Sequence, residues 1–105
     1  MVFQLGSALL DACVLAVLAK EDTYGYVLTQ NVKAMIDVSE SSLYPVLRRL
    51  QKDDCLTTYD QPFQGRNRRY YSITEQGKTM LAQYQEEWQQ YKSKVDDILT
   101  GGIQP

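Results

Sequence analysis

Residues 39–50 read SESSLYPVLRRL, which is the pattern of a short amphipathic helix. Ser39 suits the N-cap position, because its hydroxyl can accept a hydrogen bond from an unpaired amide of the first turn. Pro45 stands late for a first-turn proline, so we expect the helix to begin one or two residues after Ser39. Apolar residues at positions i, i+3, i+4 and i+7 line one face: Leu43, Val46, Leu47 and Leu50.

The opposite face of this helix carries side chains that suit DNA. Short hydroxyls can approach base edges and phosphates, a tyrosine can donate to a phosphate, and an arginine can bind guanine through two hydrogen bonds. Taken alone, these residues are explained equally well as a solvated helix face without function. The residues are Ser41, Ser42, Tyr44, Pro45, Arg48 and Arg49.

Two further helices are expected before this one. Residues 5–19 are too continuously apolar for a surface helix, so they predict a central helix covered on most sides. A second helical stretch opens at residues 23–26 (TYGY) and carries apolar residues at helical spacing as far as Ile36. We include Tyr24, at this opening, among the expected DNA contacts.

A basic hairpin is expected after residues 53–54. Residues 56–59 and 69–73 are short runs whose composition is typical of β-strands. Residues 61–68 between them predict a polar loop with Gly65 at its tip. Arginines there can reach flanking phosphates or the minor groove, although Arg69 can instead pair with an acid of the hairpin. The expected wing contacts are Gln64, Gly65, Arg66, Asn67 and Arg68.

The strongest periodic signal lies in a last helix, which Thr74 starts and which runs to about Leu99 before Gly101. Apolar and aromatic residues there are spaced 3, 4, 3, 4 and 3, which is a heptad seam. We expect a second subunit to cover part of this seam, because the three-helix core already has its own apolar partners. The seam consists of Leu81, Tyr84, Trp88, Tyr91, Val95 and Ile98.

The order helix, helix, helix, hairpin, helix predicts a mainly α fold with a small two-stranded β wing. We expect a winged helix-turn-helix with a long C-terminal dimerisation helix. The predicted parts are a DNA-binding domain (residues 1–73), the dimerisation helix (74–99) and a flexible tail (100–105).

Charge and composition narrow the function. The net charge is −2, yet residues 41–71 hold six basic and three acidic side chains. The chain has no histidine, which removes the common general base and metal ligand. Without a glycine-rich phosphate loop or an obvious pair of carboxylates, we expect no enzyme, no cofactor and no metal site.

The sequence also predicts a cytoplasmic protein with no membrane partner. The apolar run of residues 8–19 is interrupted by Asp11 and is shorter than the roughly 20 residues that cross a bilayer. Residues 1–7 lack the charge of a signal-peptide leader. We expect Cys13 to be buried in packing, whereas Cys55 is open to a redox role that nothing beside it supports.

Three motifs together resemble the PadR family of bacterial regulators, in the short form with a single C-terminal helix. They are residues 24–26 (YGY), 42–50 (SLYPVLRRL) and 65–77 (GRNRRYYSITEQG), and the similarity covers about residues 5–98. The resemblance implies a homodimeric repressor that binds a pseudo-palindromic operator as double-stranded DNA and is released by a ligand or a stress signal. It implies DNA contacts at the start of the third helix and in the wing.

The resemblance also implies a binding site for a small aromatic effector. In a multidrug regulator of this family, a tryptophan at a place like that of Trp88 sandwiches planar drugs with its twofold mate. Tyr84 and Tyr91 flank Trp88 as further candidates, although their rings could fill the space that a drug needs. A departure from the family is Asp53-Asp54, where a glycine is usual, so we expect that turn to be built differently. The alternative function is a winged-helix protein-interaction module without operator binding.

Overall fold

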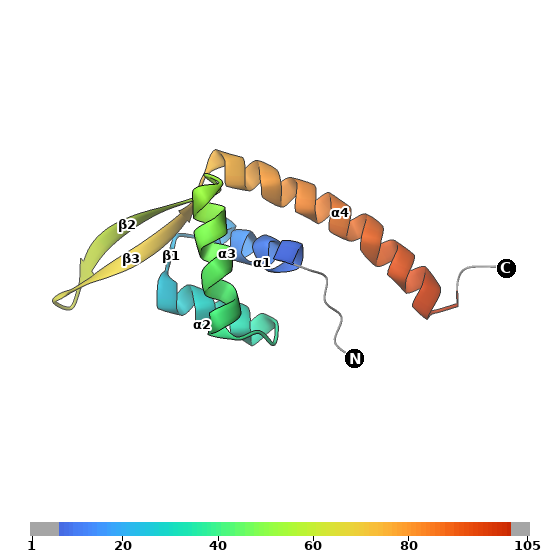
Figure 1. The fold of residues 1–105 in the computed structure, drawn as a ribbon, viewed down its shortest axis with the longest axis horizontal. Helices are drawn as coiled ribbons and strands as arrows, with labels where there is room; N and C mark the ends of the chain where they lie inside the picture. Colours follow the sequence, from blue (N-terminus) through green and yellow to red (C-terminus); the bar gives the residue numbers. More distant parts are fainter. Residues whose placement is uncertain (1–6, 102–105) are drawn as a thin grey trace.

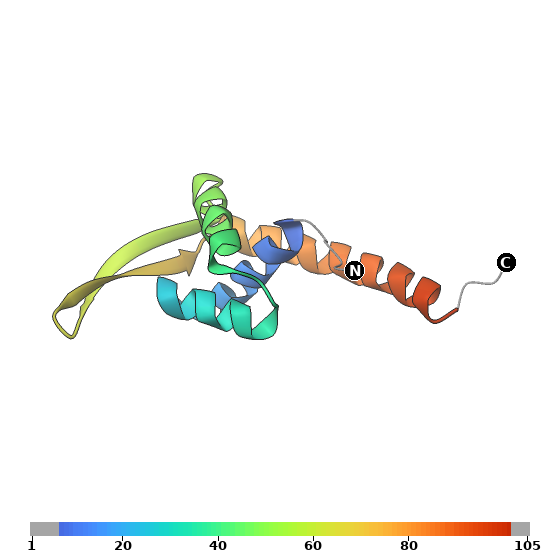
Figure 2. The ribbon, with the colours of Figure 1, turned by 60° about the horizontal axis from the view of Figure 1, so that its bottom comes forward.

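A computed structural model describes residues 7–101 of the protein. The hairpin projects from one side of a three-helix cluster and the last helix from the other, so the molecule measures 63 × 28 × 21 Å (Figures 1 and 2). No helix within the described residues combines the length and the apolar character needed to span a membrane. The elements are α1 (Ser7–Lys20), β1 (Thr23–Tyr24), α2 (Gly25–Met35), α3 (Glu40–Lys52), β2 (Leu56–Phe63), β3 (Arg66–Ile73) and α4 (Glu75–Leu99).

Helix α1 is the centre of the core, as its continuous apolar sequence predicts. Val14, Leu15 and Leu18 are almost completely buried, and α1 contacts α2, α3 and α4. The start of the predicted helix, residues 5–6, lies outside the described residues. The other helices and the sheet complete the core with Leu28, Val32, Leu43, Val46, Leu47, Leu50, Cys55, Leu56 and Leu81.

The two cysteines differ in burial. Cys55 is fully buried, its Sγ donates to the Asp53 carbonyl at 3.7 Å, and burial raises the pKa of its thiol. Cys13 is half-buried at the edge of the core rather than buried. A buried, protonated thiol is a poor redox sensor, so the structure favours a packing role for Cys55.

Helix α3 begins at Glu40 and confirms the predicted N-cap, because the Ser39 hydroxyl accepts from the Ser42 amide at 3.3 Å. Its four predicted apolar residues are all buried. Pro45 lies inside the helix and cannot donate to the carbonyl four residues before it. That carbonyl belongs to the exposed residue Ser41, where solvent can satisfy it.

The turn after α3 differs from our expectation. The Cys55 amide donates to the Leu50 carbonyl and the Asp54 amide to the Gln51 carbonyl, the pair of hydrogen bonds of a Schellman motif. Asp54 has φ 61°, the left-handed conformation that this motif requires and that glycine adopts most easily. The chain therefore keeps the glycine-type turn with aspartate in it.

The sheet is larger than the predicted two-stranded wing. Three antiparallel strands lie in the order β1-β3-β2, because residues 23 and 24 pair with residues 71 and 70 instead of opening α2. The predicted loop of residues 61–68 is wrong: β2 and β3 are paired as far as Phe63 and Arg66. Gln64 and Gly65, both with positive φ, form the two-residue turn whose twist suits a hairpin.

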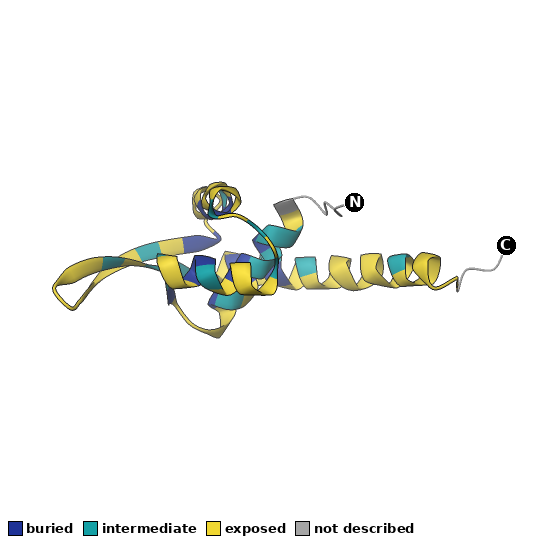
Figure 3. Ribbon diagram, turned by 90° about the horizontal axis from the view of Figure 1, so that it is seen from below, coloured by how far each residue is buried: buried dark blue, intermediate teal, exposed yellow. Residues whose placement is uncertain are grey.

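Helix α4 is anchored at its start and extends free of the core at its end. The Thr74 hydroxyl accepts from the Gly77 amide at 3.0 Å and donates to the Asp54 carbonyl at 2.6 Å. Gly77 allows the close approach, because a Cβ there would lie 2.3 Å from the Cys55 carbonyl oxygen. Beyond Tyr84 the helix is mostly exposed (Figure 3). It ends at Leu99 as predicted, and residues 102–105 of the predicted tail lie outside the described residues.

Candidate nucleic-acid interface

The exposed face of α3 presents five of its six predicted DNA contacts to solvent. The hydroxyl of Ser39 lies 2.9 Å from that of Ser41 and 3.0 Å from that of Ser42, so three hydroxyls gather at the helix start. A helix N-terminus with a cluster of exposed hydroxyls is suited to bind a phosphate. The exposed residues are Ser41, Ser42, Tyr44, Pro45 and Arg48.

The sixth residue, Arg49, is placed differently. Its guanidinium is half-exposed and forms an ion pair with the buried carboxylate of Asp11 on α1. Residues 48 and 49 are about 100° apart around a helix, which separates the solvent side from the side that meets α1. The ion pair sets Arg49 apart from the other predicted DNA contacts.

The wing holds one of its arginines between two aromatic rings. The Cζ atom of Arg68 lies 4.5 Å from the ring centre of Tyr24 and 4.3 Å from that of Phe63. Such cation–π contacts orient a guanidinium and leave its edge free for hydrogen bonds. Phe63 was missed from the sequence, because the predicted loop hid that residues 63 and 68 share a face of the sheet.

Three tyrosines form a row across the same face of the sheet. Tyr24, Tyr70 and Tyr59 are neighbours in register, with ring centres 6.1 Å and 5.5 Å apart. The Tyr59 hydroxyl donates to Asp22 at 2.8 Å, and this hydrogen bond raises the pKa of Tyr59. The row ties the hairpin to the start of α2.

The remaining wing residues are either exposed at the hairpin end or held in an ion pair. Gln64, Gly65, Arg66 and Asn67 are exposed at the hairpin end. Arg69 lies with its Nε 3.6 Å from Oδ1 of Asp60, its cross-strand neighbour, as the alternative for this residue predicted.

Comparison with known proteins identifies the family. The model of the PadR-like family of transcriptional regulators matches residues 14–83. The chain belongs to the PadR-like family. The predicted winged-helix fold and the predicted family are thereby confirmed, and DNA-binding regulation is the function of this family.

Two solved structures share the fold along nearly the whole chain, and a further relative matches most of the sequence. A Streptococcus mutans protein of known structure is 38% identical, with a TM-score of 0.87 over 100% of this chain and 99% of that one. A PadR-like transcriptional regulator from Bacillus cereus is 30% identical, with a TM-score of 0.82 over 92% and 97% of the chains. An uncharacterised protein from Lysinibacillus sphaericus is 31% identical over 88% of this chain and 89% of its own.

Part of the heptad seam on α4 is buried in the core of this PadR-like chain, and the rest is exposed to solvent. Leu81 is buried in the core of its own chain, so a second subunit would have little of it to contact, whereas Tyr84 is half-buried against α1 and keeps part of its ring accessible. Periodicity identifies an apolar face but not what covers it. Exposed fractions are 40% for Trp88, 46% for Tyr91 and 65% for Ile98, and Leu99, missed from the sequence, is 68% exposed. Val95 is half-buried.

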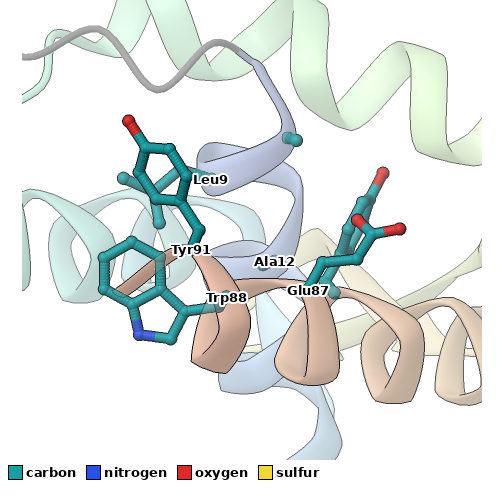
Figure 4. Close-up of a pocket in the computed structure, with 7 residues that line it drawn as sticks. Leu9, Ala12, Glu87, Trp88 and Tyr91 are labelled. Carbon is teal, nitrogen blue, oxygen red and sulfur yellow. The ribbon is translucent and has the colours of Figure 1, made fainter. Parts of the chain in front are cut away.

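A groove of about 480 Å³ lies between α1 and α4 (Figure 4). The three predicted ligand residues all line it, and the rings of Trp88 and Tyr91 lie 6.3 Å apart at a 38° tilt. The rings of Tyr84 and Tyr91 therefore do not fill the space beside the Trp88 indole. The complete lining is Ala8, Leu9, Ala12, Tyr84, Glu87, Trp88 and Tyr91, of which the α1 residues and Glu87 were not predicted.

A buried carboxylate joins this groove to α3. Asp11 pairs with Arg49 and also accepts a hydrogen bond from the Tyr84 hydroxyl at 3.2 Å. Burial raises the pKa of Asp11, although Arg49 and Tyr84 act against that change. Burial and the charge of Asp11 raise the pKa of Tyr84 to about 12. The sequence signal for Asp11 was a lone acid in an apolar helix.

Proposed function

We propose that this PadR-like protein is a transcriptional repressor that binds a pseudo-palindromic operator as a homodimer. The observation that supports it most is that two surfaces suited to DNA occur in one chain: α3 exposes serine hydroxyls and Arg48, and the wing carries Arg68 in contact with two aromatic rings. Helix α3 would enter the major groove while the wing lies on the flanking backbone. A repressor acts where its operator lies, so the proposal places the protein in the cytoplasm.

The uncovered part of α4 supports the homodimer. Trp88, Tyr91, Ile98 and Leu99 are large apolar residues exposed on a helix that extends beyond the core. A contiguous exposed apolar surface of this kind is typical of a protein interface. A twofold dimer closed there would present two α3 helices to half-sites about 34–36 Å apart, one turn of DNA.

The groove between α1 and α4 supports release by a small planar apolar or phenolic ligand. Its volume and aromatic lining suit a flat molecule, and Trp88 lies both in the groove and on the exposed surface of α4. A ligand that binds one angle between subunits more tightly would misalign the two α3 helices.

The first experiment is a fluorescence-anisotropy titration of the full chain with a labelled duplex from upstream of its own gene. It uses two salt concentrations and a scrambled duplex as control. We expect tight binding that weakens with salt and prefers the upstream duplex. If both duplexes bind weakly and equally, the titration is repeated with a library of random duplexes. The same result there would overturn the proposal of a repressor and favour the protein-interaction module. The net charge of −2 also suits such a module.

A further inference from the structure

We infer that Asp11 is a positioning residue that joins the groove between α1 and α4 to the DNA-facing helix α3. The inference rests on the proposed operator binding and names the route by which that binding is regulated. Asp11 belongs to α1, Arg49 to α3 and Tyr84 to α4. We call these three residues the Asp11 network.

The two oxygens of the Asp11 carboxylate serve two different helices. Oδ1 is paired with Nη2 of Arg49, and Oδ2 accepts the hydrogen bond of the Tyr84 hydroxyl at 3.2 Å. The Asp11 side chain is only 7% exposed. Burial of a carboxylate costs free energy unless the carboxylate keeps its partners. Displacement of either Tyr84 or Arg49 therefore changes the interaction of Asp11 with the other residue.

Tyr84 places one end of the network in the groove. Its ring lines the groove together with Trp88 and Tyr91, while its hydroxyl donates a hydrogen bond to Asp11. A molecule or a partner side chain that enters the groove therefore meets the ring whose hydroxyl holds Asp11. Displacement of that ring removes one of the two partners of the buried charge.

Arg49 places the other end of the network beside the candidate DNA contacts. Arg49 directly follows the exposed Arg48 and lies on the same helix as Ser41 and Tyr44. The apolar stripe of α3 faces the core, so the ion pair with Asp11 adds a polar restraint on rotation of α3 about its axis. A change in that rotation would move every exposed side chain of α3 relative to the wing.

The first test substitutes Tyr84→Phe, which removes the hydroxyl and keeps the ring. Tyr71→Phe is the matched control, because it removes the hydroxyl of another half-buried tyrosine, on β3, outside the Asp11 network, the groove and the proposed interfaces. Hydrogen exchange of the full chain reports on residues 40–52 of α3, with residues 25–35 of α2 as internal reference. Anisotropy with the operator duplex reports on DNA affinity.

For Tyr84→Phe we expect amide exchange in α3 to rise about fivefold relative to α2, and operator affinity to fall about three- to tenfold. Tyr71→Phe should change neither. Exchange in α3 that stays as in the wild type, or rises only together with α2, would overturn the inference. Operator affinity that stays at the wild-type value in Tyr84→Phe would also overturn it.

The second test separates positioning from direct contact. Arg49→Gln should weaken operator binding while the salt slope stays unchanged, because a positioning residue neutralises no phosphate. A slope lowered by about 0.9 would assign Arg49 to a phosphate and overturn the inference. Tyr84→Phe should have no further effect in an Asp11→Asn background; if Asp11→Asn does not fold, the single variants decide.

The two proposals fail in different ways. If the wild-type chain selects no duplex at all, operator binding is wrong, while the exchange of α3 still decides whether Asp11 links the helices. If the wild type binds its operator and Tyr84→Phe behaves like Tyr71→Phe, operator binding stands and the role of Asp11 is wrong.

Discussion

The guanidinium of Arg68 stacks on the ring of Phe63, with Cζ 4.3 Å from the ring centre and Phe63 itself 44% exposed. The two residues come from different strands, β3 and β2, near the end of the hairpin. The ring of Tyr24 also lies 4.5 Å from this Cζ, so two contacts restrict the Arg68 side chain before it meets DNA. Pre-ordering a long side chain reduces the entropy that binding must overcome.

Removal of the Phe63 ring should therefore weaken DNA binding without removing a charge. We expect Phe63→Ala to reduce operator affinity about two- to fivefold, the size of an exposed cation–π contact. Phe63→Tyr keeps a ring and should bind as the wild type does. The measurement is anisotropy at fixed salt, and equal affinities for all three proteins would show that the stacking does not matter for binding.

Removal of the wing charges should change the salt dependence. The double variant Arg66→Ala and Arg68→Ala should bind more weakly, with a slope of log affinity against log salt that is smaller by about 0.9 for each lost phosphate contact. Arg69→Ala is the matched control from the same strand, because Arg69 is paired with Asp60. An unchanged slope in the double variant would exclude the wing from the phosphate backbone.

The left-handed turn after α3 offers a stabilising substitution. Asp54→Gly should raise the free energy of unfolding by about 1 kcal/mol, because glycine adopts φ 61° without strain. Loss of a negative charge at a helix C-terminus acts in the same direction. Asp53→Gly is the control, since Asp53 has φ −86° and should give no gain. Urea unfolding at fixed protein concentration measures both variants, and a destabilised Asp54→Gly would contradict the argument from φ.

A charge on the exposed seam should separate the subunits of the proposed homodimer. Ile98 is 65% exposed in the single chain, and Ile98→Asp should raise the dimer dissociation constant at least about tenfold through lost apolar burial. Ser93→Asp adds the same charge on the opposite side of α4 and should leave association unchanged. Analytical ultracentrifugation measures both, and equal constants would move the interface away from residue 98.

Local signals in the sequence were sufficient for the helices, except for the start of α2, where residues 23 and 24 form a strand. The spacing of Leu43, Val46, Leu47 and Leu50 and the hydroxyl of Ser39 predicted α3, because periodicity and N-capping depend only on residues within a few positions. The same reasoning failed for the hairpin. Residues 60–69 are mostly exposed on both faces of the strands, so no alternation of apolar and polar residues indicated that pairing continues to Phe63 and Arg66.

The sequence by itself determined the order of the helices, the N-caps of α3 and α4, the basic hairpin and the apolar seam of α4, since each depends on neighbours along the chain. Only the tertiary structure decided which partner each face meets. It assigned Leu81 and Tyr84 to the chain's own core, left Trp88 exposed, and paired Arg49 with Asp11, 38 positions earlier. The physical reason is that helical spacing defines the direction of a side chain around its helix axis, whereas its partner depends on how separate elements pack.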